Sequence, residues 1–164
     1  MRSILIPLLA TALFIVILGV FGGKLGNGHI INPLAGEPKE DISIGTVPLK
    51  VSVANDEQER KEGLSGKSSL PEDEGLLFVF DQKDVFPSFW MREMLIPIDI
   101  IWINDGKVTK IDKNLVPPEK NTQDSSLKLY YPNKPIDYVL EVNAGFADKN
   151  GVEIGTEVGL PDGI

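Results

Sequence analysis

The chain has 164 residues, a formal net charge of −8 and 42% hydrophobic residues, which is enough for one domain with a substantial apolar core. It contains no cysteine, which excludes disulfides, thiolate metal sites, thiol nucleophiles and lipoprotein anchoring. The residues after 36 carry 14 basic and 24 acidic side chains, because Arg2 and Lys24 are the only charged residues before them. Such an acidic domain is not expected to bind nucleic acid or anionic lipid.

The first segment, Ser3–Gly23, contains no charged residue and no Asn, Gln or His. Its length matches the roughly 20 apolar residues that span a bilayer. We therefore expect residues 1–23 to form an N-terminal transmembrane anchor. Arg2 and the free amino terminus favour a single-pass orientation with the domain outside the cytoplasm. A cleaved signal peptide is the alternative, although Val20-Phe21-Gly22 is a poor cleavage site, and cleavage would make the protein secreted.

Residues 24–45 are expected to be a flexible linker, because Gly and Pro interrupt any periodic pattern and apolar residues are sparse. The only histidine, His29, falls in this linker, where we expect it to be solvated. Catalytic triads that use histidine and multi-histidine metal sites are thereby excluded from the globular part. We expect the globular domain to span residues 46–164.

The domain starts with a period-two pattern at residues 47–54, which predicts a half-buried strand. Asp56 and Glu59 then form a capping-box pattern for a short helix that Gly63 would end. Residues 76–80 are a continuous apolar run between polar segments, as in a buried strand. Residues 85–91 and 98–103 predict two further strands.

Asp105-Gly106 is the strongest local signal, because this pair fits the two central residues of a type I′ hairpin. It would join a strand at 98–104 to one at 107–112. Residues 114–133 predict a long surface loop, and residues 136–142 and 153–158 predict the last strands. Six or seven short strands with one small helix indicate a mostly β domain, folded as a compact antiparallel sheet or a half-open barrel.

Seven segments in this order resemble the domain of unknown function 192 family (the UPF 0127 group). They are Glu59–Leu64, Gly75–Phe80, Phe89-Trp90-Met91, Pro97–Ile101, Asp105–Val108, Val139–Gly145 and Gly151–Gly155. The resemblance runs from about Val51 to Val158 and is specific through the order of its parts. It implies an N-terminal signal or anchor, which is common in the family, but it implies no particular activity.

A two-residue hairpin loop makes residues whose numbers sum to 211 face each other. Ile100 would face Ile111, Trp102 would face Thr109, and Asp99 would face Asp112. Like charges directly opposite are destabilising. We therefore expect a cationic neighbour, a carboxyl with a raised pKa, or a bulge that breaks the register before Asp99.

Four residues are candidates for binding a ligand. Arg60 is the leading counter-charge for Asp99, and the two could line a polar pocket or form a structural pair or backbone clamp. Trp90 alternates with Phe89 and Met91, and it could pack in the core or offer a stacking surface. Glu141 is an acid among apolar strand residues, and it could line a site or accept backbone hydrogen bonds near Gly145.

We expect a membrane-anchored, extracytoplasmic binding or accessory domain for a small polar ligand, such as a sugar or cell-envelope fragment. A hydrolase that uses Asp99 and Glu141 is the first alternative, and such carboxyl pairs lie ~5–10 Å apart. A structural interaction domain with an acidic surface is the second. No catalytic residue or cofactor is assigned. We expect no metal site, because the acidic residues lack the clustered spacing of a Ca²⁺ loop.

Overall fold

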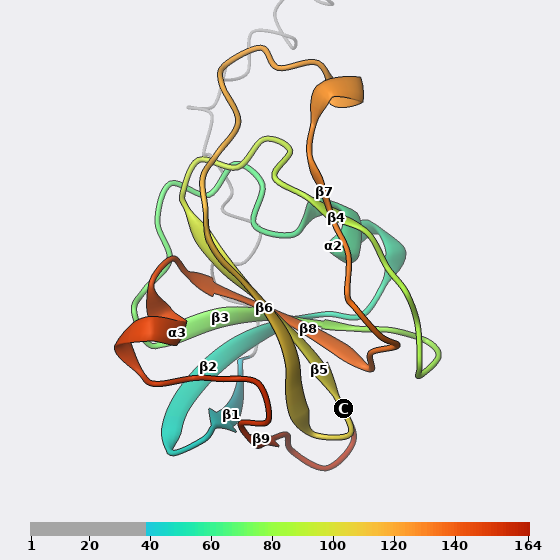
Figure 1. The fold of residues 1–164 in the computed structure, drawn as a ribbon, viewed down its shortest axis with the longest axis vertical. Coiled ribbons are helices and arrows are strands. Elements are labelled where there is room, and N and C mark those ends of the chain that lie inside the picture. The colour runs from blue at the N-terminus through green and yellow to red at the C-terminus, as the bar shows by residue number, and fades with distance from the viewer. Residues whose placement is uncertain (1–38) are drawn as a thin grey trace, which may run out of the picture. The chain divides into compact units, whose positions relative to one another are not determined.

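The computed structural model describes residues 39–164, so the predicted anchor at Ser3–Gly23 lies outside the described residues. Within residues 39–164, no helix combines the length and apolar character needed to cross a membrane. This part of the chain is mostly β, with a curled half-barrel sheet, a separate strand pair and two short α-helices (Figure 1).

The main sheet has seven strands in the order β6-β5-β8-β3-β2-β1-β9. Their bounds are β1 Glu40–Ile44, β2 Val47–Ala54, β3 Glu74–Val79, β5 Ile98–Asn104, β6 Lys107–Leu115, β8 Tyr138–Asn143 and β9 Val158–Gly159. The second sheet pairs β4 (Phe89–Trp90) with β7 (Leu129–Tyr130). The α-helices are α2 (Glu57–Glu62) and α3 (Phe146–Lys149), and a 3₁₀ turn, η1, spans Asp124–Ser126.

β1 lies within the stretch predicted to be the linker. Its buried Ile42 and Ile44 alternate with more exposed polar residues, and the strand pairs antiparallel with β2. This pattern covers only five residues and follows a segment rich in Gly and Pro, so the sequence did not predict a strand here.

The sheet curls because its two edges meet at one end. Val108 at the start of β6 donates to the carbonyl of Thr156 at 2.9 Å and accepts from the amide of Gly155 at 2.8 Å. Val158 of β9 donates to the carbonyl of Gly106 at 2.8 Å. These bonds link the hairpin to the segment before β9, which makes the sheet a half-barrel and leaves fewer open edges.

The helix predicted after the first globular strand is present as α2. Asp56 Oδ1 accepts from the amide of Glu59 at 2.8 Å, and Glu59 Oε2 accepts from the amide of Asp56 at 3.3 Å, so the capping box is confirmed. The helix ends at Gly63, whose φ is 53°. α2 lies in the connection between β2 and β3, which pair in parallel. This pair is an exception to the antiparallel sheet expected from sequence.

A second helix, α3, was not predicted. It contains only four residues, too few to display a helical period, and it starts directly after Gly145, whose φ is 81°. The expectation of one helix was therefore wrong. Its Phe146 and Ala147 are buried against the sheet.

The predicted hairpin at Asp105-Gly106 is confirmed, with φ values of 47° and 64° at the two turn residues. The predicted register, in which the numbers of paired residues sum to 211, holds only as far as Ile103 opposite Val108. Thr109 is then an extra residue in β6, and its hydroxyl donates to the Trp102 carbonyl at 3.2 Å. The expected Trp102–Thr109 pair was therefore wrong, because such a bulge shifts every later pair by one residue.

Beyond this bulge, Trp102 faces Lys110, and Ile100 faces Asp112 instead of Ile111. Asp99 does not face Asp112, because the bulge at Thr109 has already placed Asp112 opposite Ile100, and a second irregularity follows between the Ile98 and Ile100 pairs. Of the three outcomes considered, a bulge before Asp99 is the one observed.

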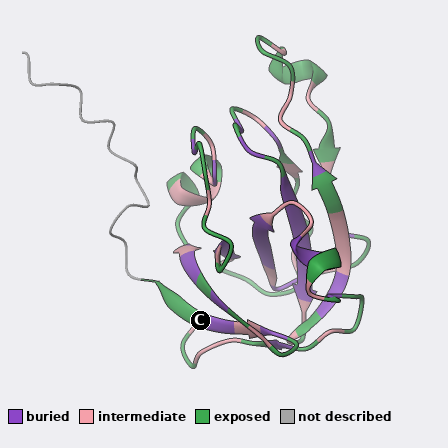
Figure 2. Cartoon of the chain, turned by 90° about the vertical axis from the view of Figure 1, so that its left-hand side faces the viewer, coloured by how far each residue is buried: buried purple, intermediate pink, exposed green. Residues whose placement is uncertain are grey.

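Two apolar cores lie on the two faces of the sheet, and β5 contributes to both. Ile101 and Ile103 pack in the core that contains Phe146 of α3, whereas Ile100 and Trp102 pack in the core that contains Leu64 after α2. Residues Ile98 to Ile103 are all buried for this reason. Figure 2 shows the buried positions along the central strands and the exposed ones in the projecting loops.

Candidate functional site

Glu141 is the most unusual side chain in the described part of the chain. It lies in the middle of β8, opposite Leu76 of β3 on one side and Ile100 of β5 on the other. The residue is only 5% exposed, and its Oε2 is buried without a hydrogen-bond partner. Burial raises the pKa of the Glu141 carboxyl to about 8. A buried polar atom without a partner costs about 1–3 kcal/mol, so it needs an explanation.

Glu141 lines a pocket of ≈160 Å³. This Glu141 pocket is bounded by α2 and the residues after it, by the end of β3, and by the segment that leads into β4. Its lining residues are Arg60, Lys61, Glu62, Gly63, Leu64, Ser65, Phe78, Phe80, Pro87, Ser88, Phe89, Trp90, Met94 and Glu141. Three separate parts of the chain therefore converge on a single buried carboxyl.

Gly63 helps to keep the space beside this carboxyl open. A Cβ at this position would lie 3.9 Å from Glu141 Oε2 and 3.4 Å from Phe78 Cζ. Its φ of 53° also disfavours other residues, because an L side chain rarely adopts this backbone conformation. The residue that ends α2 thus also shapes the pocket.

Aromatic rings form one wall of the pocket. Phe89 packs edge-to-face against Phe78, with ring centroids 4.8 Å apart, and against Trp102, with centroids 5.5 Å apart. Such contacts add about 0.5–1.5 kcal/mol per pair beyond burial. They join the short β4 to the core and give the pocket a fixed wall.

Trp90 stands at the rim of the pocket and is 39% exposed. The guanidinium of Arg92 lies 5.9 Å from the centre of its ring. The sequence left open whether this indole packs in the core or borders a site, and the structure places it at the pocket. The fully buried tryptophan is Trp102, whose Nε1 donates to Asp112 Oδ2 at 2.8 Å.

Arg60 also lines the pocket but makes no ion pair with Asp99. Its Nη1 donates to the carbonyls of Asn55 at 2.7 Å and Val79 at 2.9 Å. Its Nη2 lies 3.7 Å from Asp81, and the guanidinium lies 5.9 Å from the Phe80 ring centre. Arg60 therefore ties α2 to the ends of β2 and β3, as in the backbone-clamp interpretation.

Asp99 is fully buried, and three backbone amides bind its carboxylate. Oδ1 accepts from Asn114 at 2.7 Å and from Gly145 at 3.2 Å, and Oδ2 accepts from Ala147 at 3.0 Å. Two of these donors belong to the first turn of α3, where amides lack intrahelical partners. Charge-assisted bonds of this kind compensate a buried carboxylate. Asp99 thus fixes α3 and the distorted end of β6 to β5.

The structure therefore brings Arg60, Trp90 and Glu141 to one pocket and places Asp99 elsewhere. Asp99 faces Val142 across the sheet, whereas Glu141 faces Ile100. Because side chains alternate along a strand, Asp99 lies on the face that packs against α3, and Glu141 lies on the opposite face.

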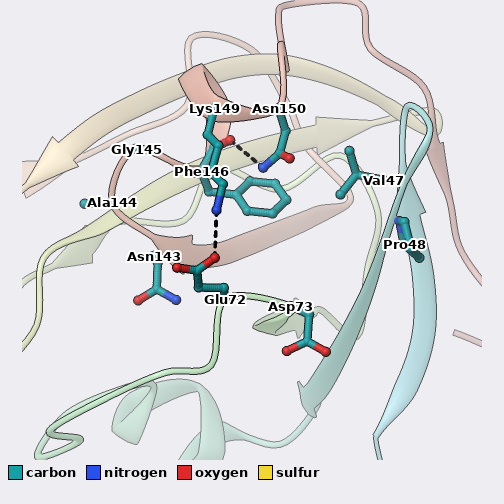
Figure 3. Close-up of a pocket in the computed structure, with 10 residues that line it drawn as sticks. All are labelled: Val47, Pro48, Glu72, Asp73, Asn143, Ala144, Gly145, Phe146, Lys149 and Asn150. Carbon is teal, nitrogen blue, oxygen red and sulfur yellow. Dashed lines mark hydrogen bonds and ion pairs between the residues drawn. The ribbon is translucent and has the colours of Figure 1, made fainter.

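A second pocket, of ≈290 Å³, lies between α3 and the loop before β3 (Figure 3). Lys149 Nζ binds Glu72 Oε2 at 2.7 Å across it, and this contact lowers the pKa of Glu72. The Asn143 side-chain amide donates to the carbonyls of Leu70 and Pro71. Both charged groups of the ion pair are exposed, so nothing in this pocket matches the unpaired buried carboxyl of the first.

No group of three or more acidic or histidine side chains within residues 39–164 could hold a metal ion. The chemistry available in the Glu141 pocket is therefore that of one carboxyl, two serine hydroxyls, aromatic rings and the charged side chains of α2.

Comparison with known proteins assigns the fold to a family. Residues 40–160 match the model of the DUF192 family, described as "Uncharacterized ACR". The chain belongs to this family. The predicted resemblance is thus confirmed, and the match includes β1. None of the curated proteins matches the chain.

Two crystal structures are similar to this domain. One is from Sinorhizobium meliloti 1021 and is described as "a putative transcription regulator"; it has 29% identity, a TM-score of 0.65, and covers 74% of this chain and 93% of its own. The other is a protein of unknown function from Novosphingobium aromaticivorans DSM 12444, with 28% identity, a TM-score of 0.67, and coverage of 78% and 89%.

Sequence reasoning missed Gly63, Phe78, Phe80 and Phe89 as pocket residues. Phe78 and Phe80 lie two residues apart, so a strand would direct both to one face. This signal could have linked them to each other. It could not link them to Glu141, because the pairing of β3 with β8 joins segments about 60 residues apart.

Proposed function

We propose that this domain is a binding module that holds a small polar ligand in the Glu141 pocket. The observation that supports the proposal most directly is the unpaired Oε2 of Glu141 inside a pocket with a fixed aromatic wall. A ligand that donates a hydrogen bond to this oxygen would remove the penalty of leaving it unpaired. Small-molecule sites typically combine an apolar lining with a few polar groups of this kind.

In this proposal the predicted residues have different roles. Glu141 binds the polar group of the ligand, and Trp90 covers its apolar part at the rim. Arg60 positions the wall, because its guanidinium already donates to two carbonyls and lies against Phe80. Asp99 is left out, since its oxygens already accept from three amides and it lies on the other face of the sheet. For the same reason we do not propose hydrolysis by an Asp99–Glu141 pair.

The test is a titration of the full-length protein with three small probes of similar size: 1-propanol, propionamide and n-propylammonium chloride. Amide NMR signals of residues 63–65 and 88–90 should shift with at least one probe. Glu141→Gln should weaken that binding at least tenfold, whereas Glu153→Gln, an exposed acid outside the pocket, should leave it unchanged. Absence of any shift with all three probes would contradict the proposal.

The uncharged segment Ser3–Gly23 supports the further proposal that the domain is held at a membrane, outside the cytoplasm. Membrane fractionation with protease added to intact cells checks this location. Full-length protein should appear in the membrane fraction and be degraded by external protease. The N-terminus of the membrane-bound protein is then sequenced. A sequence that starts near Gly23 would exclude an uncleaved anchor and favour a signal peptide.

A further inference from the structure

We infer that the ligand class of the Glu141 pocket is a small organic ammonium compound, whose N–H groups bind Glu141 and whose carbon chain lies against the aromatic wall. The inference rests on the proposed function, because it names the ligand that the same pocket would take.

Glu141 lacks a hydrogen-bond donor. In the ionised form that would bind a cation, its carboxylate is an acceptor only, and its Oε2 has no hydrogen-bond partner within residues 39–164. The backbone amides that satisfy Asp99 come from strand and helix ends, but Glu141 lies in the middle of a strand that is paired on both sides. A bound ligand can supply the donor that the strand does not. An ammonium group brings three N–H donors and a compensating charge.

Aromatic rings line the pocket beside Glu141. Aromatic rings carry a negative face that attracts cations within about 6 Å of the ring centre. Arg60 lies 5.9 Å from the Phe80 ring and Arg92 lies 5.9 Å from the Trp90 ring. Two rings that line the pocket thus already have cationic neighbours. Carboxylates combined with aromatic faces provide the recognition chemistry of organic ammonium ions.

The other charged groups around Glu141 come from one helix. Besides Glu141 itself, the charged side chains that line the pocket are Arg60, Lys61 and Glu62, all on α2. The remaining lining residues carry no charged side chain. Arg60 is compensated by Asp81 and two carbonyls. The domain is also strongly acidic, which raises the local concentration of cations.

Binding of a cation would ionise Glu141. Its pKa of about 8 means that the empty pocket holds a neutral carboxyl at pH 7. When an ammonium ion binds, the carboxyl loses its proton to solvent, and the ion pair R–NH₃⁺···⁻OOC forms. No other bond changes. About 0.9 proton should be released per bound ligand at pH 7, because that fraction of Glu141 is protonated beforehand.

The volume of the cavity limits the ligand to a small molecule. A cavity of ≈160 Å³ corresponds to about five water molecules at ~30 Å³ each. A short alkylammonium ion with three carbons fits this volume. Its uncharged analogue, 1-propanol, has nearly the same shape and forms a matched control for the charge.

Isothermal titration calorimetry of the full-length protein with n-propylammonium chloride tests the inference. The titration is run in buffers with different ionisation enthalpies, which measures the number of protons released. We expect binding with about 0.9 proton released at pH 7 and only about 0.1 at pH 9. The apparent Kd should rise about tenfold from pH 7 to pH 6, because protons compete for Glu141. 1-Propanol should bind at least tenfold more weakly.

Each other outcome has a definite meaning. Binding of 1-propanol or propionamide that depends on Glu141, without binding of the amine, overturns the ammonium assignment and leaves the binding module intact. Absence of binding by all three probes contradicts the proposed function itself. Amine binding without proton release at pH 7, or equal binding by Glu141→Gln, places the amine elsewhere and also overturns the inference. The proton count needs only the wild-type protein, so it stands even if the variant fails to fold.

Discussion

Replacing Glu141 with glutamine should change how the stability of the protein depends on pH. Below pH 4.5 the carboxyl is protonated in both the folded and the unfolded state, so it has no effect. Between pH 4.5 and about 8 the unfolded state ionises while the folded state holds its proton. The free energy of unfolding therefore falls by about 1.4 kcal/mol for each pH unit across this window.

The total loss in the wild-type protein is about 5 kcal/mol by pH 8, of which about 3 kcal/mol has accumulated at pH 7. Glutamine has no titrating proton, so its stability should not show this fall. The difference in unfolding free energy between Glu141→Gln and the wild type should thus shift by about 3 kcal/mol in favour of the variant from pH 4.5 to pH 7. Above pH 8 the difference should become constant.

Urea unfolding at several pH values, followed by the fluorescence of Trp90 and Trp102, measures this difference. Other groups also titrate, and Glu72 has the opposite sign, because Lys149 lowers its pKa and so adds stability above its ordinary range. Such contributions cancel between two variants that both retain them. If the stability curves of wild type and Glu141→Gln run parallel from pH 5 to pH 8, Glu141 is not held neutral by burial, and the reasoning is refuted.

Three further predictions concern the framework around the pocket. Asp99→Asn should cost about 2–3 kcal/mol in urea unfolding, because an NH₂ group would face amides that donate to the carboxylate; unchanged stability would contradict the clamp. Gly75→Ala should lower stability by about 1–3 kcal/mol in thermal melts, since its Cβ would lie 2.9 Å from the Glu141 carbonyl oxygen; an unchanged melting temperature would refute this close approach. Arg60→Met should lower the free energy of unfolding by about 2 kcal/mol in urea, because two hydrogen bonds to backbone carbonyls are lost. A loss that disappears at high salt would indicate that the ion pair with Asp81 is responsible instead.

Local sequence patterns predicted the elements that depend on local chemistry. The capping box of Asp56 and Glu59 and the Asp105-Gly106 turn each depend on residues within a few positions of one another, and both are present. The bulge at Thr109 could not be predicted this way. It depends on the curvature of the sheet, which arises where β6 meets the segment before β9.

The partners of the charged residues were harder to predict than the strands. Arg60, on the short helix after the first globular strand, was expected to be the leading counter-charge for Asp99. Its guanidinium instead binds the carbonyls of Asn55 and Val79, which lie at the ends of β2 and β3. The parallel pairing of these strands brings the two carbonyls together, and such long-range pairing leaves no signal in the local pattern.

Asp99 and Glu141 look alike in the sequence, since each is an acid between apolar residues of a strand. The structure separates them by the supply of free backbone amides. Asp99 is the second residue of β5 and lies next to the distorted end of β6 and the first turn of α3, where amides without ladder partners are available. Glu141 lies between two paired strands, where the backbone amides are used in the ladders. Burial of Asp99 is therefore compensated within the fold, and its hydrogen bonds explain how α3 is attached. Burial of Glu141 is not compensated by any described residue, so the fold alone gives no reason for a carboxyl at this position. The ligand that we propose for this pocket would supply the missing donor and, with it, that reason.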